Sequence, residues 1–254
     1  MTDPLTALAL LVLAALYLDG WVQETAARAG GVPTARFVGF FVGLTITALT
    51  LLSPLDGLGY RFFWAHMLQH LVLILAAAPL LAWSDANQLL RLALPEFIQR
   101  GLAHILASPS AHKWHSGPRA AWLATGALAV AIWIWHVPTV HDAALATPLL
   151  HSAEHLSVLG TAALFWRVVF TSGEHRVDPG LVAVLVSLIS LQGSLLSAIL
   201  MFSPVTLCRS YAGNPIEDQV LAGLLMCIPA SFIYLASTLW ALTRMLTQGR
   251  PHAR

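Results

Sequence analysis

Long apolar stretches are the feature that most constrains how this chain can fold. A helix that crosses a bilayer needs about 20 predominantly apolar residues. Hydropathy along the sequence marks seven such stretches, at residues 4–22, 37–53, 62–83, 120–137, 150–171, 181–203 and 219–245. Because lipid offers no partner to backbone N–H and C=O groups, each stretch is expected to be helical. The sequence therefore predicts an all-α, polytopic membrane protein whose residues 1–254 form a single seven-helix transmembrane domain.

The composition excludes several other classes of protein. Hydrophobic residues make up 57% of the chain and charged residues only 10%, whereas a soluble domain carries about 25% charged residues. The formal net charge is +1 and the basic residues are scattered, which argues against a nucleic-acid partner. The two cysteines, Cys208 and Cys227, cannot build a disulfide framework.

The segment 84–119 differs from the seven apolar stretches. It mixes basic and acidic residues with leucine, isoleucine and phenylalanine, which predicts an amphipathic helix lying on the surface of the lipid bilayer. Met1–Pro4 holds no basic residue, so we expect the first stretch to be a membrane span rather than a cleaved signal peptide.

Basic residues divide unevenly between the two sets of segments that join the spans. The N-terminus and the loops 54–61, 138–149 and 204–218 hold only Arg61 and Arg209. By the positive-inside rule, this distribution places the N-terminus outside and the C-terminus in the cytoplasm. The remaining eleven basic residues are Arg28, Arg36, Arg91, Arg100, Lys113, Arg119, Arg167, Arg176, Arg244, Arg250 and Arg254.

Ionisable residues gather near the predicted outer membrane face. They occupy the outer ends of three spans and the loops beside them, and ionisable residues at such positions are costly and typical of functional sites. They are Asp56, His66, His70, His136, His141, Asp142, His151, Glu154, His155, Glu217 and Asp218.

Histidine spacing within this group indicates a metal site. His66 and His70 are four residues apart and share one helix face, and His151 and His155 repeat the arrangement. Two such pairs on neighbouring helices can surround one or two metal ions with imidazole nitrogens. Glu154, Asp142 and Asp218 could act as further ligands or could fix the histidine tautomers.

Other interpretations remain open at this point. A single histidine pair is more often a polar helix face, His136 beside Trp135 suits an interfacial anchor, and proton transfer is the main rival to metal binding. Sulfur ligands such as Met226 and Cys227 favour copper over zinc, although each alone is more often a packing residue; Met67 points about 100° away from His66 around the helix. We expect the other five histidines to be cytoplasmic surface residues: His104, His112, His115, His175 and His252.

Four motifs occur in an order and spacing that mark one membrane-protein family. They are SPLD at 53–56, WAHMLQHLVLILAAAPLLAW at 64–83, IWHVPTVHDAALATPLLHSAEHLSVLGTAALF at 134–165 and IEDQVLAGLLM at 216–226. From about residue 53 to the end of the last predicted helix, the chain resembles the CtaG family of integral-membrane cytochrome c oxidase assembly factors. The matching residues are Asp56, His66, His70, His136, Asp142, His151, Glu154, His155, Asp218, Gln219 and Met226. Cys227 departs from the family, which has an aromatic residue there, and so adds a thiol near the site.

The resemblance implies a multi-pass protein of the bacterial cytoplasmic membrane that matures a haem–copper oxidase. It would bind copper through His66, His70, His151 and His155, with help from His136 and Met226, and deliver it to the oxidase catalytic subunit. A periplasmic copper donor could load it, and no turnover chemistry is expected.

Two other functions compete with the assembly role. An intramembrane zinc hydrolase would use three histidines and a carboxylate base, and a haem protein or transporter is a weaker alternative. The oligomeric state is open, because Gly39 and Gly43 could pack against a helix within the chain or in a second copy.

Overall fold

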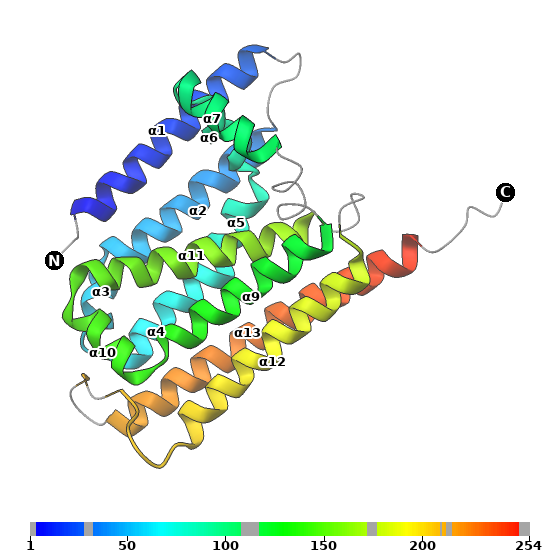
Figure 1. The fold of residues 1–254 in the computed structure, drawn as a ribbon. Helices are drawn as coiled ribbons and strands as arrows, with labels where there is room; N and C mark the ends of the chain where they lie inside the picture. The colour runs from blue at the N-terminus through cyan, green and yellow to red at the C-terminus, as the bar shows by residue number, and fades with distance from the viewer. Residues whose placement is uncertain are drawn as a thin grey trace.

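The computed structural model describes residues 4–27, 33–107, 117–171, 177–208, 210–211 and 215–248, and every element in them is helical. Long helical segments cover the seven predicted ranges (Figure 1). They are α1 (Pro4–Ala27), α2 (Thr34–Leu52), the run of α4 (Phe63–Val72), η1 (Leu73–Ala77) and α5 (Ala78–Trp83), α9 (Gly117–Trp135), α11 (Pro148–Phe170), α12 (Pro179–Phe202) and α13 (Pro215–Gln248). Some residues predicted to be cytoplasmic or in outer loops lie outside the described residues: Arg28, His112, Lys113, His115, His175, Arg176, Arg209, Arg250, His252 and Arg254.

Six of these segments are long and apolar enough to cross a membrane, so the chain is a multi-pass membrane protein. The exception is α11, which has 23 residues but a lower hydropathy. Its polar residues include His151, Glu154 and His155, and all three are buried. The least apolar of the seven segments therefore carries half of the predicted metal site.

Proline sets the start of many of the helices. It is the first residue of α11, of α12 and of the short helix α10 (Pro138–Ala146). The first turn of a helix leaves its N–H groups unpaired, so the missing N–H of proline costs nothing there and its fixed φ favours the helix. The carboxylate of Asp178 adds a cap to α12 by accepting a hydrogen bond from the backbone N–H of Leu181 at 3.1 Å.

The third span contains one wider, π-helical turn, η1. Pro79 lies two residues after the end of this turn. Proline has no N–H, so Pro79 cannot donate a hydrogen bond to the carbonyl of Ile74, five residues earlier. The indole N–H of Trp166 donates to that carbonyl instead, at 2.7 Å. This buried hydrogen bond ties α11 to the third span just below the polar cluster.

The core is centred on α11, which packs against α5, η1, α9 and α10. Its buried residues recur at three- and four-residue intervals from His151 to Val169, as expected for one face of a helix. The N-terminal half of this stripe is polar, and the C-terminal half is apolar, with Phe165 and Trp166 in the main hydrophobic cluster. On the other side, α13 packs against both α4 and α12, whereas α1 lies at the edge against α2.

The segment 84–119, in which an amphipathic helix was expected, forms two helices. They are α6 (Ala86–Leu92) and α7 (Glu96–Ala107). Pro95 separates them, because proline disfavours helical backbone at the preceding residue and cannot donate to the turn before it. Residues 108–116 of this segment lie outside the described residues.

The small-residue pair Gly39 and Gly43 packs within the chain. A side-chain carbon at Gly39 would meet the Trp83 ring at 2.9 Å, and one at Gly43 would meet Leu80 at 3.1 Å. The two glycines therefore allow α2 to approach α5 closely, and this face of α2 is already occupied by α5.

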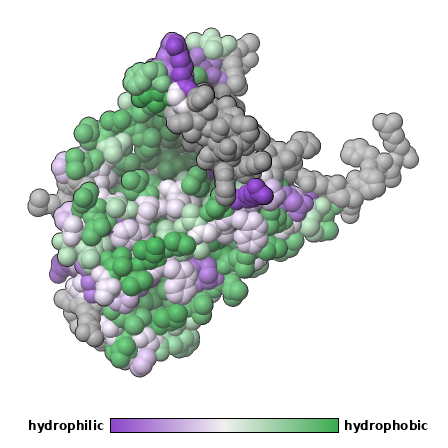
Figure 2. All heavy atoms as spheres, viewed as in Figure 1, coloured by the Kyte–Doolittle hydropathy of each residue, from purple (hydrophilic) through white to green (hydrophobic). Residues whose placement is uncertain are grey.

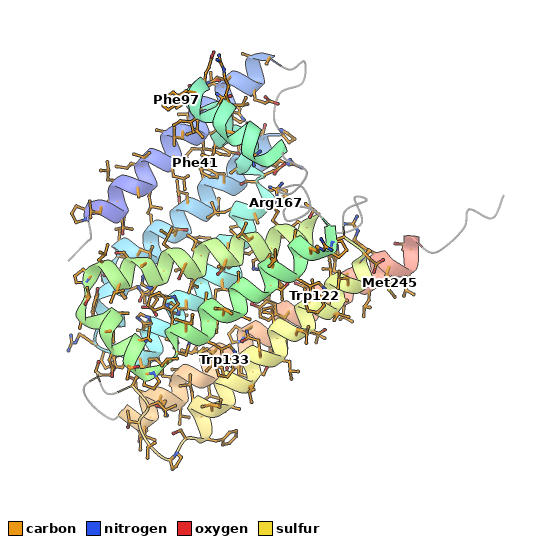
Figure 3. All side chains as sticks on the ribbon, viewed as in Figure 1. Phe41, Phe97, Trp122, Trp133, Arg167 and Met245 are labelled. Atoms are coloured by element: carbon orange, nitrogen blue, oxygen red, sulfur yellow. The ribbon has the colours of Figure 1, made fainter. Side chains whose placement is uncertain are left out.

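The surface has the character of a lipid-facing bundle. Figure 2 shows hydrophobic residues over most of the visible flank and strongly hydrophilic residues at the end that carries α6 and α7. Trp122 and Trp133 lie toward the two ends of α9 (Figure 3) and are 50% and 36% exposed, as expected for aromatic residues at membrane interfaces. At the opposite end from α7, α10 and the short helix α3 (Pro54–Gly59) lie beside the first turns of α4 and α11 (Figure 1).

Candidate metal centre

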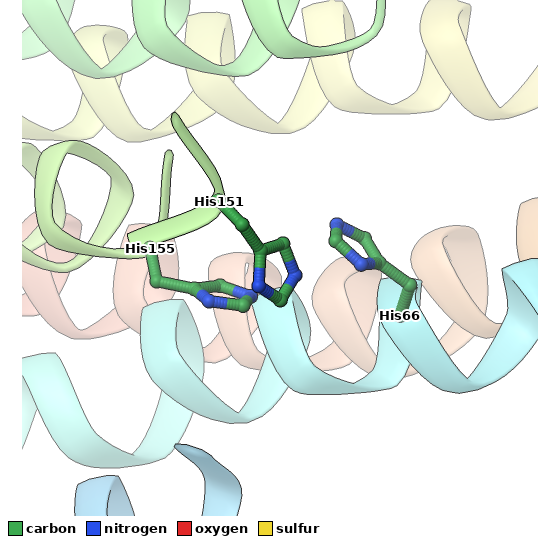
Figure 4. A group of neighbouring side chains, drawn as sticks. All are labelled: His66, His151 and His155. Carbon is green, nitrogen blue, oxygen red and sulfur yellow. The ribbon is translucent and has the colours of Figure 1, made fainter. Parts of the chain in front are cut away.

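The two predicted histidine pairs meet across the α4–α11 contact. Figure 4 shows the His66 ring on α4 directed toward the rings of His151 and His155 on α11. The ring centroids of His66 lie 5.3 Å from His151 and 5.5 Å from His155. One ring nitrogen from each of the three lies within 4.8 Å of the others, which is close enough for a shared metal ion. The spacing argument for these residues is therefore consistent with the geometry.

Glu154 lies at the middle of the cluster and is fully buried. Its Oε1 is 3.2 Å from Nε2 of His66 and 3.3 Å from Nε2 of His70, and the three residues form a second group able to hold a metal ion. Nδ1 of His141, on α10, is 3.9 Å from the same oxygen. Three histidines, two from α4 and one from α10, thus surround one carboxylate oxygen of α11.

Two tyrosines that no sequence pattern indicated support the cluster from its rim. Tyr60, just after α3, places its hydroxyl 2.8 Å from Nδ1 of His151. Tyr211 places its hydroxyl 2.7 Å from Nε2 of His141. A second-shell partner on one ring nitrogen fixes the ring and can leave the other nitrogen free to ligate. For His151 this requires that its Nδ1–H donate to the oxygen of Tyr60.

Several polar atoms of the cluster are buried without a hydrogen-bond partner. Buried polar groups are nearly always paired, so this concentration of unpaired nitrogens and carboxylate oxygens marks the cluster as a candidate binding site. The unpaired atoms are Nδ1 of His66, Nε2 of His70, Nδ1 of His141, Nε2 of His151, Nε2 of His155 and Oε2 of Glu154.

His141 shows why neutral imidazole is favoured in this environment. Burial lowers the pKa of His141 to about 4, although the Glu154 carboxylate acts in the opposite direction. The ring is therefore neutral at physiological pH and keeps a lone pair. A neutral ring is the form in which histidine binds metals.

His136 and Met226 are placed beside the cluster rather than in it. Nδ1 of His136 donates to the carbonyl of Ile132 at 2.7 Å, and its Nε2 is 3.1 Å from Sδ of Met67. Met226, Met67, His70 and His136 line one cavity between the helices. The fully buried Met67, which points away from His66 on the same helix, therefore meets His136 instead.

Three other predicted carboxylates, Asp56 in α3, Asp142 in α10 and Asp218 in α13, bond to protein groups. Both oxygens of Asp218 accept backbone N–H bonds at the start of α4, from Phe63 and from Trp64, each at 2.8 Å. Asp142 accepts a hydrogen bond from Ser210 at 2.6 Å, and Asp56 accepts one from Gln69 at 3.4 Å. None of the three belongs to a described group that could hold a metal ion, and neither does Cys227, whose thiol is free.

One comparison with known proteins identifies a family. The family model for cytochrome c oxidase caa3 assembly factors (Caa3_CtaG) matches residues 15–248 of the chain. No curated protein and no solved structure gives a significant match.

Proposed function

The chain belongs to the Caa3_CtaG family of cytochrome c oxidase assembly factors, and from that premise we propose that it carries copper to the oxidase. Copper would be bound at the cluster of His66, His70, His151, Glu154 and His155, and passed to the catalytic subunit docked against the bundle. In this proposal copper is cargo, so the protein is a metallochaperone rather than an enzyme.

The observation that carries the proposal is the environment of Glu154. Its side chain is fully buried, and among the described residues only histidines lie within ion-pair distance of it. A buried carboxylate is costly unless a cation compensates it. A metal ion would supply that charge, and the unpaired histidine nitrogens around it would bind the ion.

The donor set suits copper. Sites made of imidazole nitrogen and carboxylate oxygen bind Cu(II) with higher affinity than Zn(II). His66, His70 and His155 are no more than 5% exposed, so release requires a movement that uncovers them. The short helices α3 and α10, at the end of the bundle nearest the cluster (Figure 1), are the elements whose displacement would open it.

The membrane orientation of the proposal follows from the charges. Seven spans with the N-terminus outside would place α3 and α10 at the outer face of the bacterial cytoplasmic membrane, where a periplasmic donor could load the site. Asp85 pairs with Arg167 at 2.9 Å and with Arg36 at 3.6 Å. Both arginines lie beside the same aspartate, so they share one end of the bundle, as the proposed alternation of the spans requires.

Metal analysis of the purified protein tests the proposal. The full-length chain in detergent, prepared without chelator, is expected to contain copper. A variant with His66, His70, His151 and His155 all changed to alanine should lose it and still insert in the membrane, because none of these residues supplies hydrophobicity. His104→Ala, in α7 at the other end of the bundle, is the matched control and should keep its copper.

The same two variants should differ in their ability to support oxidase assembly in cells. The four-alanine variant should fail to restore caa3-type oxidase activity to a strain without the chromosomal gene, whereas His104→Ala should restore it. Intact oxidase activity with the four-alanine variant would refute the role of the cluster in assembly.

A zinc-dependent hydrolase is the second candidate, and one observation favours it. His66, His151 and His155 form a three-histidine group, and Glu154 lies beside them as a carboxylate that could act as a base. Zinc at about one ion per chain, together with metal-dependent release of fatty acid from lipid esters or amides, would support this function over copper delivery.

A further inference from the structure

A cavity lies beside the histidine cluster, on the side toward the middle of the bundle. It has a volume of about 50 Å³, and its walls come from α4, η1, α9, α12 and α13. Leucine, isoleucine and alanine make up about half of its lining, and Met67, His136, Met226 and Gln192 also face it. His70 borders both this cavity and the cluster, because it belongs to the group with His66 and Glu154.

His136 and Met67 present two lone pairs to one another in this cavity. The carbonyl of Ile132 can only accept, so Nδ1 of His136 carries the proton that bonds it at 2.7 Å. In the neutral ring, Nε2 then has a lone pair and no hydrogen. The atom that faces it at 3.1 Å is Sδ of Met67, a thioether that also has no hydrogen. The contact therefore lacks a donor and would be completed by a cation between the two atoms.

Gln192 provides an independent sign of a polar occupant. It lies in the middle of α12, and both its side-chain nitrogen and its oxygen are buried without a hydrogen-bond partner among the described residues. An unpaired amide costs free energy inside a membrane protein. An aliphatic wall would not need this amide, so its presence indicates that the cavity holds something other than lipid.

We propose that Sδ of Met67, Nε2 of His136 and Sδ of Met226 form a second site, for a soft monovalent cation of the Cu(I) class, joined through His70 to the histidine–glutamate cluster. Thioether sulfur selects Cu(I), and imidazole accepts it. This inference rests on the proposed function in taking copper as the cargo. It adds that the chain holds the reduced ion at a site chemically distinct from the outer one.

The geometry needs only a small adjustment to take an ion. Metal–nitrogen and metal–sulfur bonds of about 2.0 and 2.3 Å with a trigonal angle would separate Nε2 and Sδ by about 3.7 Å. The present separation is 3.1 Å, and the rotatable methionine side chain can provide the difference. His70, whose ring centroid is 4.6 Å from His66 and 6.2 Å from His136, is placed to bind from either side as an ion passes.

X-ray absorption spectroscopy of the Cu(I)-loaded protein tests this site. Cu(I) is added anaerobically to the full-length chain in detergent, and sulfur neighbours of copper are measured at about 2.3 Å. The wild type should show them. A variant with Met67→Leu and Met226→Leu, which nearly conserves volume, should lose them and bind Cu(I) at least tenfold more weakly. Met245→Leu, a half-exposed methionine near the far end of α13 (Figure 3), should leave both unchanged.

The His66→Ala and His151→Ala double variant separates this inference from the proposed function. In this variant, copper should still show sulfur neighbours by X-ray absorption. The copper ions that have only nitrogen and oxygen neighbours should be lost. Copper in the wild type without sulfur neighbours, or sulfur neighbours that survive both leucine changes, would overturn the second site and leave the outer one intact. If the double leucine variant unfolds, Met226→Leu alone should still remove one sulfur neighbour, and an unchanged signal would overturn the site.

Discussion

At the scale of single residues, burial sets the reactivity of the Cys208 thiol. Cys208 is 4% exposed and packs with Phe63, Leu200 and Tyr211. Burial raises the pKa of its thiol from 9.0 to about 12, which lowers the thiolate fraction at neutral pH about a thousandfold. Because the thiolate is both the nucleophile and the metal ligand, we expect Cys208 to bind no copper.

Alkylation checks this expectation directly. In a Cys227→Ser background, N-ethylmaleimide at pH 7 should label Cys208 only after the protein is unfolded in detergent. Labelling of the folded protein should become faster as the pH rises toward 12, because the thiolate forms only near its raised pKa. Rapid labelling of the folded chain at pH 7 would show that the thiol is accessible and ionised.

The sequence predicted the residues of the cluster better than it predicted their partners. The spacing of His66 and His70 on one helix, repeated by His151 and His155, indicated a shared site, and the geometry brings all four together. Tyr60 belongs to no periodic pattern, since it lies in a turn between α3 and α4. Its contact with His151 depends on how two distant segments fold back, which local spacing does not encode.

At the scale of elements, Asp218 couples the position of α4 to that of α13. Its carboxylate, at the start of α13, caps the first N–H groups of α4 by accepting from Phe63 and Trp64. Capping bonds from a carboxylate stabilise a helix start by about 1–2 kcal/mol. Asp218→Ala should therefore lower the thermal unfolding midpoint in detergent and also weaken copper binding, because the same first turns carry His66.

The neighbouring residue gives the control for this change. Glu217→Ala removes a carboxylate from the same turn of α13, but Glu217 is exposed and should leave both readouts near the wild-type values. Equal midpoints for the two variants would show that the cap contributes nothing measurable to α4.

An element could be predicted from the sequence where hydropathy and helix-starting residues in that segment determine it. The stretch predicted at 181–203 is the helix Pro179–Phe202, because proline and a capping aspartate fix its start. The π-helical turn at Leu73–Ala77 could not be read from hydropathy. It becomes understandable only with Trp166 in place, because that side chain satisfies the carbonyl that Pro79 leaves free.

At the scale of the whole molecule, the number of spans depends on α11. Its 23 residues give a length of about 35 Å, enough to cross a hydrocarbon core of about 30 Å. Its low hydropathy comes from a polar stripe that faces His66 and His70 rather than lipid. A helix whose polar groups are covered by its neighbours can span the membrane at little cost. The packing of α11 therefore makes its low hydropathy compatible with a membrane span.

Cysteine accessibility on the two sides of α11 tests the span. Thr147→Cys and Thr171→Cys, each in a full-length Cys208→Ser and Cys227→Ser background, mark positions just before and just after the helix. If α11 crosses the membrane with the N-terminus outside, an impermeant maleimide added to spheroplasts should label Thr147→Cys at once and Thr171→Cys only after lysis. Labelling of both positions before lysis, or of neither, would place the two ends of α11 on one side. The chain would then have six spans, both termini would share a compartment, and the charge distribution would need another explanation.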